Sequence, residues 1–567
     1  MGLSQSLQIG QSGLLSAQQA LQTAGNNLAN VGTRGYHRQS VDLAPTRTTP
    51  TGANQRIGTG VGIESIGREV NQALDSRLRG AVADENRSTT REQLLGRIES
   101  IENELSGASL SDRLNQFFNN WSELANSPED QSLRRVVTNE ASSLSSFVQS
   151  MRTELTNLRS QVTKQINSSA DRVNELLTRI EELNHKIGQN EATGGEAMSL
   201  RDERGRALKE LSEYIDISTQ SRSNGEVDVY VGSEPVISNG DSRGVELAER
   251  EQDGETVTRL VTKDNKAALD LTSGTLAAQL RVKREDVAGA IDKVDQFAKQ
   301  LIYQVNRRHS QGQGLELIDN VTSDNAVNDA TAALNSDAAG LKHSVTHGSF
   351  KLHVTQQSTG QRQTHTIDVD LDGINPGSDT TLQSVANAID GKANVNASVT
   401  TGGELKIDTG DDFAVSFTDD SSGLLAAMGI NSFFKGADAT DIAVSDAVQS
   451  NPGRLAVSAN HQKADNGTAL AIAGLRDEPI GALNGQSLSG FWRNHVEQVG
   501  IEVSEAKEQG KADQAVRENL KQQQQAVSGV NVDEQTIDLM QYQRAFQASA
   551  RFVSTVDQMM QTLLQSV

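Results

Sequence analysis

LSQSLQIGQSGLLSAQQALQTAGNNLANV, residues 3–31, is the stretch that decides the fold, because it carries a single apolar stripe. Leu7, Leu14, Leu21 and Leu28 lie seven residues apart along it. The interleaved positions hold mostly small side chains: Leu3, Gly10, Ala17 and Ala24. Spacings that alternate between three and four residues are typical of a coiled-coil helix. With small residues at one of the two core positions, this helix would let a second helix approach closely.

The other end of the chain carries a bulkier stripe with the same spacing. Residues 532–567 read VDEQTIDLMQYQRAFQASARFVSTVDQMMQTLLQSV. Their apolar series is Leu539, Tyr542, Phe546, Ser549, Val553, Val556, Met560, Leu563 and Val567. Asn531 can cap this helix, and Glu534 completes a capping-box pattern. The first helix should stop near Asn30, because Gly32 and Gly35 follow closely.

Neither helix can bury its apolar stripe alone, so we predict that the two termini pair in a coiled coil. The same stripes are our candidate assembly interface, because a heptad stripe serves either internal packing or a partner. The candidate interface residues are Leu7, Leu14, Leu21, Leu28, Leu539, Tyr542, Phe546, Val553, Val556, Met560 and Leu563.

Composition limits the possible classes of function. The 567 residues carry a net charge of -22, and so acidic a surface argues against nucleic-acid binding. There is no cysteine, which excludes disulfides, thiolate metal sites and cysteine nucleophiles. No apolar run approaches the roughly 18 residues of a membrane span, so we expect no membrane insertion. The first basic residue is Arg34, so we expect no cleavable secretory signal.

Helical patterns dominate inward from the ends. After Ser127-Pro128-Glu129-Asp130, which is typical of a helix N-terminus, neither Pro nor Gly occurs until Gly188. Heptads over 144–162 and 173–187 therefore predict one helix of about 60 residues, about 90 Å long. Further helices are predicted within 70–105, 110–124, 286–309 and 492–506.

Strand patterns occupy a smaller part of the chain. Glu226–Val231 alternates with a period of two residues and predicts a strand. From about 315 to 450 Gly, Asp, Thr and Ser become frequent, and alternation over 350–354, 367–371 and 415–417 predicts several more strands. We interpret this region as a β-rich domain inserted between helical segments.

The predicted fold is therefore α+β and multidomain. A long helical rod or bundle carries paired terminal coiled-coil helices and an inserted β-rich domain. The terminal assembly domain would comprise residues 1–60 and 500–567. The rod domain, with a small β region, would comprise 61–314 and 451–499, and the insertion would be 315–450.

One stretch of the insertion fits part of a calcium-binding loop. Asp368-Val369-Asp370-Leu371-Asp372-Gly373, with Asp379 at the twelfth position, matches the first half of an EF-hand. The alternative is an amphipathic strand with Ile367, Val369 and Leu371 on one face. Predicted strands flank the stretch, whereas an EF-hand needs helices. We therefore favour the strand, and leave open whether these aspartates bind calcium.

Other candidate sites also have simpler interpretations. Gly58-Thr59-Gly60-Val61-Gly62 lacks the last glycine of a dinucleotide loop, since Ile63 stands there, and is interpreted as a flexible loop. His343, His347, His353 and His365 are expected on the surface of the insertion rather than as a metal cluster. His309 follows Arg307 and Arg308, a poor setting for a metal ligand. No catalytic motif is present, and we expect no enzyme activity, cofactor or metal.

Both ends of the chain resemble a known family. Ser12–Val31 together with Gly35-Tyr36-His37-Arg38-Gln39 closely resembles the N-terminal signature of bacterial flagellar axial proteins. Ser528–Glu534, Tyr542–Arg551 and Leu563-Leu564 are similar to the hook-associated protein 1 branch of these proteins, which joins hook to filament. Two internal stretches, Leu200–Arg204 and Gly429–Phe434, resemble that branch as well.

The resemblance implies a structural subunit of the bacterial flagellum. Subunits of this family form a ring between hook and filament, with paired terminal helices lining the inner tube. The implied partners are further copies of the chain, hook protein and hook-associated protein 3. The implied location is extracellular, reached by flagellar type III export without a cleaved signal. An export chaperone is implied at the C-terminal helix, with Tyr542, Phe546, Val553 and Val556 as its contacts.

A second interpretation belongs to a different class. The chain could be a secreted adhesin or hydrolase whose β-rich insertion binds a ligand, with the helices as a stalk. A catalytic constellation would favour it, and none is visible in the sequence. Another axial subunit, such as hook protein or hook-associated protein 3, is disfavoured by the long helix and the C-terminal motif.

Overall fold

The computed structural model describes residues 2–46, 48–52, 55–102, 104, 109–192, 194–252, 255–374, 379–462 and 464–565. The fold is α+β, as predicted, and divides into two compact units that are discontinuous in sequence. The first unit is Met1–Gln93, Val162–Lys283 and Ser504–Val567. The second unit is Leu94–Gln161 and Arg284–Val503. The three domains predicted from the sequence remain a prediction.

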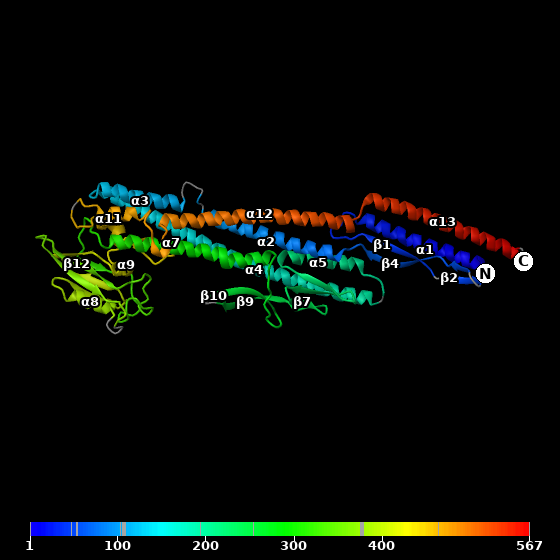
Figure 1. Cartoon of the computed structure of the whole chain (residues 1–567), viewed down its shortest axis with the longest axis horizontal. Coiled ribbons are helices and arrows are strands. Elements are labelled where there is room, and N and C mark those ends of the chain that lie inside the picture. Colours follow the sequence, from blue (N-terminus) through cyan, green and yellow to red (C-terminus); the bar gives the residue numbers. More distant parts are fainter. Residues whose placement is uncertain are drawn as a thin grey trace. The chain divides into compact units, whose positions relative to one another are not determined.

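Three long helices have residues in both units: α2 (Gln72–Glu102), α4 (Gln131–Glu191) and α12 (Leu488–Ser528) (Figure 1). At 61 residues, α4 confirms the predicted single long helix. Its predicted start at Ser127 was wrong. Asp130 caps the helix instead, since its Oδ1 accepts hydrogen bonds from the backbone N–H groups of Ser132 at 2.6 Å and Leu133 at 3.3 Å. Predicted helix position Leu105 lies outside the described residues.

The two ends of the chain lie side by side in the first unit. Helix α1 (Gly2–Ala29) packs along α13 (Val532–Gln565) (Figure 1). Helix α1 also packs against a β ribbon, which we define as strands β1 (Gln39–Pro45), β2 (Thr48–Gly52), β3 (Gln55–Gly58) and β4 (Val61–Arg68). Strands β1 and β4 are antiparallel from Gln39 opposite Arg68 to Pro45 opposite Val61, and β2 pairs with β3.

The rest of the first unit is built on α2, α4 and α12. Arg517 of α12 forms a two-pronged ion pair with Glu85 of α2, with nitrogen–oxygen distances of 2.7 and 3.0 Å. Besides these helices the unit contains α5 (Met198–Tyr214) and α6 (Thr275–Arg281). Its four-stranded antiparallel sheet runs in the order β5 (Ser218–Ser221), β6 (Val227–Val231), β7 (Glu234–Ser238) and β8 (Asp241–Ser242). A hairpin of β9 (Val245–Gln252) and β10 (Glu255–Thr262) follows. Strand β6 confirms the strand predicted at 226–231.

The second unit has an aromatic core centred on His309. Its further helices include α3 (Leu110–Asn126), α7 (Ala288–His309), α10 (Asp446–Ser450) and α11 (Gly467–Gly474). The π-helical turn Val282–Val287 precedes α7, and short 3-10 turns occur at Pro452–Arg454 and Gly481–Leu483. His309 is fully buried against Trp121 and Phe433. Its Nδ1–H donates to the Asn431 carbonyl at 2.8 Å, while Nε2 accepts from the Ala456 N–H at 2.8 Å. Both ring nitrogens are therefore satisfied in the neutral form.

The predicted insertion is rich in strands, and its strands confirm the alternating segments. One sheet has the order β13 (Arg362–Val369), β12 (Gly348–Gln356) and β16 (Phe413–Thr418). The other has the order β11 (Asn320–Thr322), β15 (Leu405–Asp408) and β14 (Asn396–Val399). Short pieces complete the region: α8 (Leu382–Asp390), α9 (Leu424–Met428), β17 (Phe434–Lys435) and β18 (Ala443–Val444). One apolar core, which includes Phe350, Ile367 and Leu382, joins the two sheets with α8 and α9.

The glycine-rich stretch 58–62 was wrongly interpreted as a flexible loop. Gly58 ends β3, and Val61 and Gly62 belong to β4. Gly60 has a φ of +120°, and a methyl group on it would lie 2.1 Å from Ser12 Oγ of α1. The glycine therefore serves a close approach of the β ribbon to α1.

The four insertion histidines were predicted on the surface, and two of them are buried. His343 is 5% exposed and stacks on Tyr303, with ring centroids 4.8 Å apart. His353 is also buried, and its ring nitrogens lie 2.8 Å from Thr364 Oγ1 and 2.9 Å from Thr418 Oγ1. Packing partners far along the chain decide this burial. His347 is exposed, as predicted, and His365 is half-buried.

The aspartate-rich stretch forms the predicted amphipathic strand end. Ile367, Val369 and Leu371 are buried, whereas Asp368 points to solvent. In the described part of the chain, the carboxylates of Asp370 and Asp372 gather with His347, and Asp368 and Asp379 lie outside that group.

The buried histidines predict that the second unit loses stability in mild acid. Burial lowers the pKa of His309 and of His343 to about 4, because a buried imidazolium lacks solvation. An unfolded histidine titrates near pH 6.5. Between these values the unfolded chain binds protons that the folded chain does not, so stability should fall as pH drops from 6.5 to 4. The slope should be at most about 1.4 kcal/mol per pH unit for each histidine.

Urea unfolding between pH 7 and pH 4.5 measures this slope. His343→Phe keeps an aromatic ring against Tyr303 and should make the slope shallower. His347→Phe, at an exposed histidine of the same domain, should leave it unchanged. Equal slopes in the parent and His343→Phe would contradict the assignment.

Candidate functional site

Helix α1 is uncharged from end to end, which makes it dependent on packing. Its 28 residues include no Asp, Glu, Lys or Arg. Ion pairs therefore cannot stabilise it, and an isolated helix of this kind is marginal in water. Its stability must come from the surfaces that cover it, which are α13 and the β ribbon.

Helices α1 and α13 are antiparallel and approach closely at glycines. A methyl group on Gly10 would lie 2.6 Å from Val553 Cγ2, and one on Gly13 would lie 2.9 Å from Ser549 Oγ. Near the other end of α1, the Asn27 side chain contacts Gln535. The two helices therefore run in opposite directions. The small residues at positions 10 and 13 permit the short distance between the helices.

The deepest positions of α1 are its small residues and not its leucines. Gly10, Ala17, Ala20 and Ala24 are buried, together with Ser16 and Thr23. Leu7, Leu14, Leu21 and Leu28 are half-buried. The predicted interleaved series Gly10, Ala17 and Ala24 is therefore the side of α1 that the single chain covers best, and the leucines keep part of their surface free.

The predicted residues of α13 divide by exposure. Val556 is 1% exposed, and Leu563 is 51% exposed. The others are half-buried: Leu539, Tyr542, Phe546, Val553 and Met560. Val567 lies outside the described residues. The structure thus brings the two stripes together, while their use as an assembly interface stays a prediction.

Asn27 joins four segments through one buried side chain. It is 1% exposed. Its Nδ2 donates to Gln535 Oε1 and to the Gln39 carbonyl, both at 2.8 Å. Its Oδ1 accepts from Tyr36 Oη at 2.8 Å and from the Gln39 N–H at 2.9 Å. All the hydrogen-bonding capacity of the amide is used. This residue ties α1 to the following loop, to β1 and to α13.

A second polar junction joins the loop after α1 to α5. Asp202 is buried and accepts hydrogen bonds from His37 Nδ1 and Arg68 Nη1, both at 2.7 Å. Burial alone would raise the pKa of Asp202, but the hydrogen bonds from His37 and Arg68 hold it below its usual value. Burial, followed by the Asp202 charge, raises the pKa of Tyr36 to about 12.

Sequence reasoning did not identify Asn27, His37, Arg68 or Asp202 as contacts. The only signal was that three of them fall in segments that resemble flagellar axial proteins. Asp202 belongs to Leu200–Arg204, whereas Asn27 and His37 lie within 12–39. The resembling segments from two distant parts of the chain therefore meet in the structure.

Helix α13 carries apolar surface that α1 does not cover. Ile537 and Met540 are exposed near its start. Phe552, Met559 and Leu563 are exposed near its end, spaced seven and four residues apart on one face, and the partly exposed Phe552 ring also lies beside Gly10 of α1. Leu564 is 79% exposed. At the same end Leu3, Met559 and Leu563 line a shallow groove of about 420 Å³. Contiguous apolar patches on a protein surface are typical of interaction sites.

Two groups of described residues could hold a metal ion, and both are open to solvent. They are Glu181 with His185 and Asp241, and His347 with Asp370 and Asp372. Each histidine already faces a carboxylate, at 3.2 Å for His185 Nε2 to Asp241 Oδ1 and 3.3 Å for His347 Nδ1 to Asp370 Oδ1. Among the described helices, none is long and apolar enough to span a bilayer.

Three family models match the chain in separate segments. Residues 95–322 match the model described as the flagellar hook-associated protein FlgK helical domain. Residues 7–37 match the flagella basal body rod protein model, and residues 521–566 match the flagellar basal body rod FlgEFG protein C-terminal model. The two terminal matches therefore fall largely on α1 and α13.

Three proteins with similar sequences are all named flagellar hook-associated protein 1. Flagellar hook-associated protein 1 of Salmonella typhimurium is 25% identical, and the match covers 98% of each chain. Flagellar hook-associated protein 1 of Escherichia coli is 23% identical with the same coverage. That of Bacillus subtilis is 29% identical over 37% of this chain and 43% of its own.

One solved structure shares the fold. The flagellar hook junction protein FlgK from Burkholderia pseudomallei has a TM-score of 0.50 and 16% sequence identity. The match covers 80% of this chain and all of that one.

Gly10→Ala should weaken the terminal helix pair, whereas Gly25→Ala should strengthen α1. Both substitutions gain up to about 1 kcal/mol of helix propensity. At Gly10 the new methyl group meets the stiff side chain of Val553, and overpacking costs about 1 to 3 kcal/mol. At Gly25 nothing lies within 4 Å. Amide hydrogen exchange along α1 and α13 measures the difference, and equal effects of the two variants would refute the close packing.

Asn27→Leu should release the loop and the start of α13 from α1. It leaves the Tyr36 hydroxyl, both backbone groups of Gln39 and the Gln535 amide without their partner, at about 1 to 3 kcal/mol for each group that stays buried. Gln22→Leu, at an exposed position of the same helix, is the matched control and should change little. Hydrogen exchange of residues 30–39 is the readout, and unchanged protection in Asn27→Leu would contradict this role.

Proposed function

Given that this chain belongs to the flagellar hook-associated protein 1 family and is a structural component of the flagellum, we propose that it forms the junction between hook and filament. Copies of the chain assemble into a ring through the paired terminal helices. The observation that carries this proposal is the apolar surface of α13 that remains exposed after α1 has packed against it.

The chemistry of the helix pair supports an interface between copies. Helix α1 brings no charge to a contact, so it can be covered on further sides without burying an unpaired ion. The half-buried leucines of α1 and the exposed face of α13 offer apolar area on the same pair of helices. Burying one such side chain completely is worth about 1.5 to 3 kcal/mol, so a few per copy hold a subunit in place.

We also propose which subunits lie next to this chain in the flagellum and how the chain is exported. In the ring, further copies lie beside each chain, and hook protein and hook-associated protein 3 lie on its two sides. The chain reaches the outside of the cell through flagellar type III export. Before export, a cytoplasmic chaperone covers the C-terminal helix at Tyr542, Phe546, Val553 and Val556. In the single chain Tyr542, Phe546 and Val553 are half-buried and Val556 is buried, so a chaperone at these residues covers the apolar stripe before α1 packs on it.

Met559→Ser with Leu563→Ser tests the proposal without disturbing the fold. Both side chains are about half exposed in the single chain, so the unfolding free energy of the monomer should fall by no more than about 1 kcal/mol for each. In the ring the same change removes two buried anchors, and filaments should no longer attach to hooks. Counting attached filaments by electron microscopy in a strain that carries only the variant gives the result.

Gln547→Ser with Gln561→Ser is the matched control, since both residues are exposed on the same helix. This control should leave attachment intact. Normal attachment in the Met559 and Leu563 variant, at normal export, would overturn the proposed role of the exposed face.

A further inference from the structure

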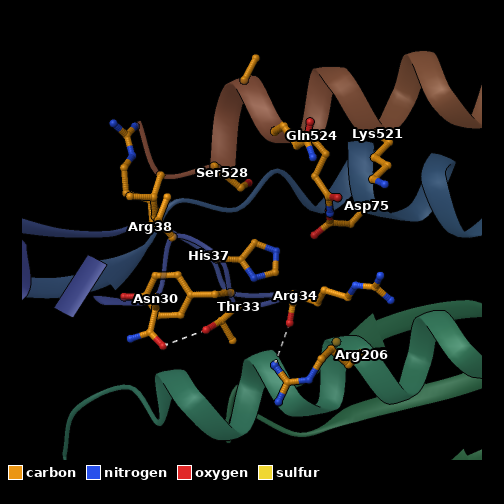
Figure 2. Close-up of a pocket in the computed structure, with 18 of the residues that line it drawn as sticks. Asn30, Thr33, Arg34, His37, Arg38, Asp75, Arg206, Lys521, Gln524 and Ser528 are labelled. Atoms are coloured by element: carbon orange, nitrogen blue, oxygen red, sulfur yellow. Dashed lines mark hydrogen bonds between the residues drawn. The ribbon is translucent and has the colours of Figure 1, made fainter. Parts of the chain in front are cut away.

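A basic cavity lies in the first unit, at the point where the loop after α1 meets α2, α5 and the end of α12. Its volume is about 990 Å³. The loop 30–38 forms one side, and residues from α2, α5 and α12 form the others. Figure 2 shows Arg34 from the loop, Arg206 from α5 and Lys521 from α12 around the same space. Elements far apart in the sequence therefore bring cations to one place.

The lining is strongly unbalanced in charge. It includes six cations, namely Arg34, Arg38, Arg79, Arg206, Lys209 and Lys521. It includes two carboxylates, Asp75 and Glu534. This excess of positive charge belongs to a chain whose net charge is -22. The rest of the surface is thus acidic, and the cavity is a local exception.

The two carboxylates of the lining already have partners. Glu534 pairs with Arg38 at 3.2 Å, and Asp75 accepts a hydrogen bond from Gln524 at 2.6 Å. Of the other five cations, Arg79 donates a hydrogen bond to Thr219 Oγ1 at 2.9 Å. Among the described residues, no carboxylate oxygen lies within 4.0 Å of the charged nitrogens of the remaining four, Arg34, Arg206, Lys209 and Lys521. The Arg206 guanidinium donates a hydrogen bond to the Arg34 carbonyl at 3.5 Å.

The neighbouring positive charges change the pKa of Lys209. Burial, followed by the charges of Lys521, Arg517 and Arg34, lowers the pKa of its ammonium group, although Glu213 one turn away acts in the opposite direction. Cations that disfavour one another's charge are stabilised when an anion enters between them. The cavity is therefore prepared for an anionic ligand in the free chain.

We propose that this cavity receives a carboxylate-bearing segment of a second copy of this chain. Four unpaired cations around a large open cavity suit several carboxylates on an extended peptide better than a single small anion. Copies with a net charge of -22 repel one another over most of their surface, so a basic recess is a place where a neighbour can approach favourably. The inference rests on the proposed function, because assembly is what brings a second copy to this face.

Binding of a hexaglutamate peptide to the full-length monomer is the first test, since it does not depend on assembly. Hexaglutamate should bind, hexaglutamine should not, and 0.5 M salt should weaken binding by screening. Arg206→Gln with Lys521→Gln should weaken binding about tenfold. Lys164→Gln with Lys507→Gln removes two exposed cations of the same unit outside the cavity and should change binding less than twofold.

Equal binding of hexaglutamate by the two double variants would overturn the site. Binding of inorganic phosphate at the cavity without binding of hexaglutamate would overturn the peptide class of ligand. Thermal unfolding checks that both double variants are folded. We expect the Arg206 and Lys521 variant to fold, because neither residue has an ion-pair partner in the described part of the chain.

A photo-cross-linking residue at Gln525 tests the occupant in assembled flagella. Gln525 is exposed and lines the cavity. A cross-link to a segment of the same chain that contains Asp or Glu is the expected result. Attached filaments with cross-links only to another protein, or to a segment without carboxylates, would overturn the second copy as occupant and leave the proposed ring intact. Normal attachment in the Met559 and Leu563 variant, with hexaglutamate binding retained, would overturn the proposed role of the exposed face of α13 and leave the cavity as an anion-binding site.

Discussion

The close antiparallel contact of α1 with α13 is the constraint on which the remaining arrangement depends. The approach is closest at Gly10 and Gly13, where an added methyl group would press on Val553 and on the Ser549 hydroxyl. The uncharged α1 has no other source of stability than packing. The contact therefore holds the N-terminal helix, and through it the β ribbon that lies against Ser12 and Ser16. Small residues allow the approach, and the bulkier stripe of α13 fills the space.

Polar junctions then determine where the helix pair joins the rest of the first unit. Apolar stripes can slide along one another, since many registers bury similar area. Asn27 has only one position in which its amide meets Gln535, Gln39 and Tyr36 together, so it specifies a single register. Asp202 does the same for the loop, because His37 and Arg68 converge on one carboxylate. Packing supplies the stability of this region, and these buried polar side chains supply its uniqueness.

The sequence predicted the features whose signal is local and periodic. Helix α4 could be predicted because its apolar spacing is not interrupted by Gly or Pro from Gln131 to Ile187. Strands β12, β13 and β16 could be predicted because apolar residues alternate along them in the sequence. The β ribbon was missed, since its strands are rich in Gly, Thr and Pro and are defined by pairing. The burial of His343 and His353 depends on Tyr303 and Thr418, which no nearby residue indicates. The hydrogen bond between Asn27 and Gln535 joins residues 508 positions apart, beyond the reach of any periodicity.

Charged and apolar surfaces are also distributed unevenly over this chain. A subunit that must remain soluble before assembly benefits from a large net charge of one sign, and that charge opposes the approach of identical copies. In this chain the terminal helix α1 is neutral, the exposed face of α13 is apolar, and the surplus of cations is gathered in the cavity beside them. The three surfaces that tolerate a like-charged neighbour thus lie around one pair of helices. In the proposed ring, attraction between copies is concentrated where the two ends of the chain meet, and repulsion acts elsewhere, which favours one mode of association over random aggregation.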